Sequence, residues 1–135
     1  MDILKTTIIR GTLLFTLLIM ASVNSTAQFP DAIINATQNA DASELSKHFN
    51  SKIELVLPQK SGVFSGAQAK LVLNDFFKKN PVSSFKIIHQ GLRENASFAI
   101  GKYQSTSEIY RFYFLTKNKD GQTYIHQLRI EKEDD

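Results

Sequence analysis

The stretch SGAQAKLVLNDFFKKNP, residues 65–81, predicts one long helix that organises the rest of the chain. Ser65 and Gln68 have the spacing of a capping box, which marks the start of a helix. Pro81 disfavours the helical conformation of Asn80, so the helix should end there. Apolar side chains recur at helical spacing along one side, and these are Ala69, Val72, Leu73, Phe76 and Phe77. We expect this apolar stripe to be buried under a sheet.

Patterns on both sides of this helix predict an α+β fold. Two short helices should come first, one beginning near Pro30 and one capped by Asp41. From Ser84 onward the apolar period changes from helical to two, which is typical of strands. The expected strands are residues 53–57, 62–64, 84–93, 96–105, 108–116 and 122–131. The last four are too close in sequence to pair except as antiparallel neighbours, so a curved antiparallel sheet should wrap over the long helix.

Four sequence motifs resemble those of a known family. They are FFKKNP at residues 76–81, SFKIIHQG at 84–91, Ile100-Gly101, and LRIE at 128–131. With these motifs the chain resembles the exported domain-of-unknown-function family numbered 4783. The resemblance implies the cone-shaped fold of the nuclear-transport-factor-two-like (cystatin-like) superfamily, and it implies no activity. The chain has Phe64-Ser65-Gly66 where Tyr-Ser-Lys is usual, so no role is carried over for residues 64 and 66.

The first 27 residues have the pattern of an export signal. Lys5 and Arg10 precede an apolar run at residues 13–21, and Ser25 and Ala27 place small residues at a signal peptidase site. We therefore expect the mature protein to be a single domain of residues 28–135. The run is shorter than the roughly 20 residues that span a bilayer, and a chain without cysteine cannot be a lipoprotein. The sequence thus predicts a soluble periplasmic or secreted protein with no membrane association after cleavage.

Composition argues against several classes of partner and cofactor. The chain has 16 basic and 13 acidic residues, and the leader contains Lys5, Arg10 and Asp2. The mature protein would therefore have 14 basic and 12 acidic residues, a balance too even to indicate a nucleic-acid-binding protein. The absence of cysteine excludes disulfides, thiolate metal sites and a cysteine nucleophile. The three histidines fall on different elements without a nearby carboxylate cluster. We therefore expect no metal and no cofactor.

Strand alternation assigns polar side chains to faces of the sheet. If the alternation is uninterrupted, His126 lies on one face with Tyr124, Leu128 and Ile130, and His89 lies with Phe85 and Ile87. Both histidines would then be on apolar faces, where a histidine is usually a hydrogen-bonded core residue. The candidate pocket residues are His126, His89, Tyr113, Tyr103, Tyr124 and Arg111.

Two functional hypotheses remain open on the sequence. The first is a non-catalytic exported domain that binds a small apolar ligand or a protein partner at its cone, with a homodimer through the Tyr- and Phe-rich sheet face as one form of partnership. The alternative is an isomerase- or dehydratase-type enzyme in which His126 acts as base with Tyr113 or His89, and Tyr113 or Tyr103 polarises a carbonyl. The resemblance implies that such enzymes of the superfamily generally need an inward acid or an Asp-His pair, and the four late strands contain no Asp, which counts against the enzyme.

Overall fold

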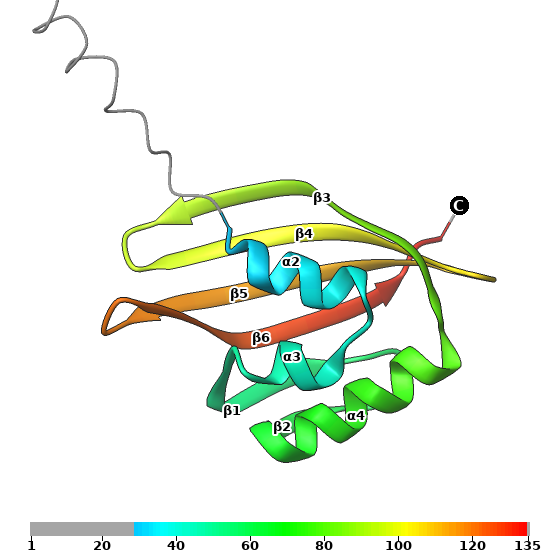
Figure 1. The fold of residues 1–135 in the computed structure, drawn as a ribbon, viewed down its shortest axis with the longest axis horizontal. Helices are drawn as coiled ribbons and strands as arrows, with labels where there is room; N and C mark the ends of the chain where they lie inside the picture. The colour runs from blue at the N-terminus through cyan, green and yellow to red at the C-terminus, as the bar shows by residue number, and fades with distance from the viewer. Residues whose placement is uncertain (1–28, 135) are drawn as a thin grey trace, which may run out of the picture.

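The computed structural model describes residues 29–134, so the expected leader lies outside the described residues. Within residues 29–134, three helices and six strands follow one another (Figure 1). The helices are α2 (Asp31–Gln38), α3 (Ala42–Ser46) and α4 (Gly66–Lys79). The strands are β1 (Phe49–Val56), β2 (Ser61–Ser65), β3 (Val82–Arg93), β4 (Ala96–Ser105), β5 (Ile109–Lys119) and β6 (Gln122–Lys132). The predicted α+β class is confirmed.

All six strands form one sheet in the order β2-β1-β6-β5-β4-β3. The four late strands are antiparallel neighbours, as predicted, and β1 joins β6 in parallel register. Figure 1 shows α2 and α3 in front of the sheet and α4 alongside its β1–β2 end. We call the side of the sheet that faces away from the helices the outer face. It carries Lys102, Tyr113 and Leu115, which alternate with the buried positions of β4 and β5.

The long helix begins and ends as the sequence predicts. Ser65 and Gln68 form both hydrogen bonds of the capping box, and Asn80 follows the last helical residue. Leu73, Phe76 and Phe77 are buried, whereas Val72 is half-buried at the edge of the stripe. The helix therefore packs through its apolar side and presents one edge to the surface.

Aromatic rings fill the space between the helices and the sheet. Tyr103 and Phe112 stack with ring centroids 4.9 Å apart, and Phe76 meets Tyr110 edge-on at 5.1 Å. Near the other end of the sheet, Phe29 packs on Phe114 at 5.5 Å. These rings therefore form the core between the helices and the sheet.

Two β-bulges contradict the uninterrupted alternation assumed from the sequence. In β3, Ile87 pairs with Gly101 but His89 pairs with Ile100, so Ile88 is an extra residue and His89 turns to the outer face. In β6, Ile125 pairs with Thr116 but Gln127 pairs with Leu115, so His126 is the extra residue.

The predicted faces of both histidines were therefore wrong. His89 is exposed instead of lying with buried Phe85. Ile125 is fully buried with Leu128 and Ile130, whereas His126 is half-buried and lies beside Lys117 and Tyr124. A period-two pattern cannot reveal such a change, because one inserted residue exchanges the faces of every residue beyond it.

Candidate functional site

A cavity of about 310 Å³ opens between α4, the β1–β2 connection and the start of β5. Its apolar wall consists of Leu57, Pro58, Leu71, Val72 and Phe76. Its polar lining consists of Gln59, Lys60, Asp75, Lys79, Asn80 and Tyr110. The helical period places residues 72, 76 and 79 on one side of α4, which is how a single helix supplies both kinds of wall. We call this space the α4 cavity.

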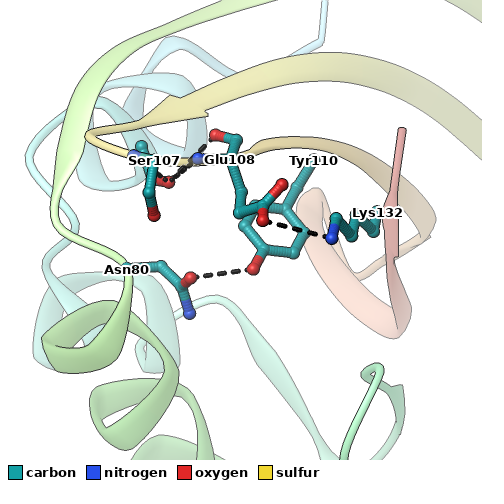
Figure 2. Close-up of polar contacts among 6 residues, drawn as sticks. Asn80, Ser107, Glu108, Tyr110 and Lys132 are labelled. Carbon is teal, nitrogen blue, oxygen red and sulfur yellow. Dashed lines mark hydrogen bonds and ion pairs between the residues drawn. The ribbon is translucent and has the colours of Figure 1, made fainter. Parts of the chain in front are cut away.

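Asn80 connects the end of α4 to two tyrosines of the sheet. Its backbone oxygen accepts a hydrogen bond from the Tyr103 hydroxyl at 2.6 Å. Its Oδ1 accepts one from the Tyr110 hydroxyl at 2.8 Å, as Figure 2 shows. Its Nδ2 donates to the oxygen of Phe76 at 3.0 Å. Asn80 is thus engaged at three atoms, which fixes the polar end of the α4 cavity.

Both tyrosines remain protonated at neutral pH. Burial raises the pKa of Tyr103 to about 12. Burial also raises the pKa of Tyr110, and the Glu108 carboxylate adds to this effect while Lys132 opposes it. Because the Tyr110 proton is donated to Asn80, the Tyr110 oxygen offers the cavity a lone pair only.

The β4–β5 turn holds Tyr110 in place. Ser105 Oγ accepts hydrogen bonds from the backbone N–H of Ser107 at 3.3 Å and of Glu108 at 2.9 Å. The Glu108 carboxylate then forms an ion pair with Lys132 at 3.1 Å, beside the Tyr110 ring (Figure 2). On the helix side, Lys79 pairs with Asp75 at 2.9 Å, and both side chains are exposed.

Comparison with known proteins assigns the family. The profile of a family described as "Domain of unknown function (DUF4783)" matches residues 30–131. The chain belongs to the DUF4783 family. A search of curated proteins finds no match.

Solved structures agree with this assignment. A DUF4783 family protein from Bacteroides ovatus is 34% identical, with a TM-score of 0.76 over 82% of this chain and 100% of that chain. A second, from Bacteroides uniformis, is 29% identical, with a TM-score of 0.75 over 80% and 100% of the two chains. An NTF2-like protein of unknown function from Silicibacter pomeroyi is 10% identical, with a TM-score of 0.59 over 76% and 88%. The last comparison shows an NTF2-like fold for this DUF4783 domain.

The six residues predicted to line a pocket do not converge in this DUF4783 domain. Tyr103, which pairs with Tyr110 across β4 and β5, is fully buried and does not line the α4 cavity. Arg111 pairs with Glu133 at 3.0 Å, and Tyr113, the next outer-face residue of β5, is half-buried. His89 is exposed. The structure does bring together His126 and Tyr124, which line a second cavity on the outer face.

Sequence reasoning missed the residues that line the α4 cavity. Asn80 was read only as the end of a helix, and Leu57 only as the end of a strand. A hint lay in Leu71, an apolar residue outside the predicted stripe, which is 68% exposed. An apolar residue on the otherwise polar side of an amphipathic helix is the sequence signal that could have pointed to this wall.

Three further observations limit the chemistry of the described residues. Within residues 29–134, no three His, Cys, Asp or Glu side chains are grouped so that they could hold a metal ion. In the same part of the chain, no helix is long and apolar enough to cross a membrane. The α4 cavity has one carboxylate in its lining, and that carboxylate, of Asp75, is paired with Lys79.

Proposed function

We propose that this DUF4783 domain is an exported, non-catalytic binding protein whose α4 cavity takes a small apolar ligand with one polar end. The observation that carries the proposal is the arrangement of the α4 cavity, with an aliphatic and aromatic wall on one side and the fixed Asn80–Tyr110 pair on the other. Export rests on the sequence pattern of residues 1–27.

The size and composition of the α4 cavity support a small ligand. Small-molecule sites in proteins usually have volumes of about 300–1,000 Å³ and walls that are largely apolar with few polar groups. At about 310 Å³ the α4 cavity lies at the lower end of this range. The side chain of Leu71 is 68% exposed on its wall, and a bound apolar ligand would remove part of this surface from water.

The polar lining defines the end group of the ligand. The Tyr110 oxygen is an acceptor without a spare proton, so it suits a ligand hydroxyl or N–H. Asn80 Oδ1 accepts from Tyr110, and one of the two Nδ2 hydrogens is donated to the oxygen of Phe76. A hydroxyl on an aliphatic body therefore matches the Asn80–Tyr110 end of the α4 cavity.

The isomerase or dehydratase alternative has no comparable support. Its proposed base, His126, and the proposed partner His89 do not line the α4 cavity, and Tyr103 donates its proton to the Asn80 backbone oxygen. A general base must be within hydrogen-bond reach of the proton it removes. We therefore retain binding as the proposed function.

The homodimer expected through the sheet is a second proposal, which rests on the outer face and not on the α4 cavity. Ile88 and Leu115 are exposed on the outer face by 44% and 38%, and the Phe98 ring covers Gly91 on the same side. Sedimentation of the purified protein at micromolar concentration tests it directly. A single species of monomer mass across the concentration range would contradict the dimer.

Native mass spectrometry tests the binding function without knowledge of the ligand. The protein is produced with its leader, recovered from the periplasm and measured without denaturant. We expect a bound small molecule on the wild-type protein and on Leu92→Glu, in which an exposed leucine elsewhere is replaced, but not on Leu71→Glu. Equal occupancy of the two variants would contradict the assignment of the α4 cavity.

A further inference from the structure

We propose that a second cavity, on the outer face beside the β5–β6 hairpin, binds a phosphate group. This cavity has a volume of about 250 Å³. It is lined by Asn50, Lys117, Asn118, Lys119, Tyr124 and His126. We call it the hairpin cavity. It shares no lining residue with the α4 cavity, so the proposal does not depend on the function proposed above.

The hairpin cavity forms where the strands depart from regular pairing. Phe49 pairs with Ile125 and Glu54 with Gln127, so four residues of β1 face a single residue of β6. That single residue is His126, which is also the extra residue in the pairing of β6 with β5. Bulges frequently redirect a side chain at a functional site. Here the bulge places the histidine beside two lysines.

The hairpin itself is rigidly defined. Asp120 and Gly121 both have positive φ, 52° and 79°, which is the geometry of a tight two-residue hairpin turn. Behind the turn, Thr123 donates to Asn118 Oδ1 at 2.7 Å. Lys117 and Lys119 lie two residues apart in β5, on one face of the strand.

The lining of the hairpin cavity offers donors and positive charge. Asn118 has its Oδ1 engaged by Thr123, which leaves its Nδ2 as a donor. Among the described residues, neither Lys117 nor Lys119 is in an ion pair. Two ammonium groups and an amide donor match the several acceptor oxygens and double charge of a phosphate.

The His126 ring adds a further donor. Its Nδ1 is buried and has no hydrogen-bond partner. A buried N–H without a partner costs more free energy than a buried nitrogen lone pair without a partner. This difference favours the neutral ring with its proton on Nε2. Since Nδ1 is out of reach of solvent, the ring can meet a bound anion through the edge that carries Nε2–H.

Charges around the ring provide a way to observe binding. Burial lowers the pKa of His126, Lys117 on β5 lowers it further, and Glu54 on β1 raises it. A phosphate bound beside Lys117 would oppose the effect of the lysine and raise the pKa of His126. This change can be followed through the Cε1 proton of the ring by NMR.

The test is a titration of the protein with inorganic phosphate at constant ionic strength. We expect saturable shifts at residues 117–119, 124 and 126, with a rise in the pKa of His126. Lys117→Gln should weaken phosphate binding by at least about tenfold, as expected when a charge-assisted hydrogen bond is lost. Lys70→Gln, which removes the same charge from the exposed side of α4, should leave binding unchanged.

Three outcomes would overturn the proposal. These are no saturable shift, equal weakening by Lys117→Gln and Lys70→Gln, or the same shifts with acetate in place of phosphate. A parallel titration with glycerol 3-phosphate separates two sources of the group. Tighter binding of the ester would assign the hairpin cavity to a phosphate ester, and tighter binding of inorganic phosphate would assign it to the free ion.

Discussion

Asn80 is the residue on which the polar end of the α4 cavity depends. It follows α4 directly, and the next residue, Pro81, leads into β3, so both the position and the backbone conformation of Asn80 are restricted. Its backbone and side-chain oxygens each accept a tyrosine proton. One residue therefore couples the end of a helix to two strands.

We expect Asn80→Ala to destabilise the fold. The change leaves the Tyr110 hydroxyl, on a buried residue, without its partner and should cost about 1–3 kcal/mol. Asn74→Ala is the control, because Asn74 is exposed on the same helix and its change should alter stability by less than about 0.5 kcal/mol. Urea unfolding midpoints compare the two variants. Equal midpoints would show that the Asn80–Tyr110 bond is unimportant for stability.

His126 gives the stability of the protein a defined pH dependence. In the folded protein its pKa lies below the ordinary histidine value of 6.5, chiefly because of burial. As the pH falls through 6.5, the unfolded chain takes up the proton first, so the folded state loses stability. Above that pH the residue is neutral in both states and makes no such difference.

The corresponding measurement is the decrease in the urea concentration at the unfolding midpoint when the pH falls from 7.5 to 5.5 in phosphate-free buffer. The decrease should be smaller in His126→Gln than in the wild-type protein. His89→Gln removes an exposed histidine from the same sheet face and should behave like the wild type. If His126→Gln keeps the full pH dependence, the lowered pKa of His126 is not its cause.

At the scale of elements, Gly101 shows how closely β3 and β4 approach. A Cβ at this position would lie 2.3 Å from Phe85 Cζ. The Phe85 ring cannot simply move away, because Phe112 and Phe114 pack against it with centroids 5.8 and 6.4 Å distant. The cross-strand contact between a glycine and an aromatic ring thus fixes this part of the sheet.

Two glycine substitutions should therefore have opposite effects. Gly101→Ala should destabilise by about 1–3 kcal/mol through overpacking. Gly66→Ala, at the first residue of α4 with no atom within 4 Å of an added Cβ, should stabilise by about 0.4–1 kcal/mol because it restricts the unfolded chain. Thermal unfolding ranks the variants. The reverse order would mean that Phe85 adjusts freely.

The elements also show what the sequence could and could not predict. The capping box at Ser65, the buried stripe of α4 and the antiparallel late strands followed from local patterns, and the structure has them. The faces of His89 and His126 did not follow, because no local signal marks the bulges at Ile88 and His126. The α4 cavity could not be predicted either, since it joins residues 57–60 to residues 71–80 through tertiary packing.

For the whole molecule, the aromatic core separates two sites. Tyr110 lines the α4 cavity and Lys117 lines the hairpin cavity, and both belong to β5. With about 3.3 Å per residue in a strand, the two positions are about 23 Å apart. Figure 1 shows β5 running from the β4–β5 turn to the β5–β6 hairpin. Each site can therefore be tested and can fail without the other.

The central claim is that the α4 cavity binds a small apolar ligand with one hydroxyl. The most direct measurement is an NMR titration of the backbone amides with 1-octanol, which has this chemistry. Saturable shifts confined to residues 57, 59–60, 71–80 and 110 are expected for the wild-type protein and for Leu92→Glu, and they should be lost in Leu71→Glu. Shifts absent from these residues, or equally strong in Leu71→Glu, would contradict the account.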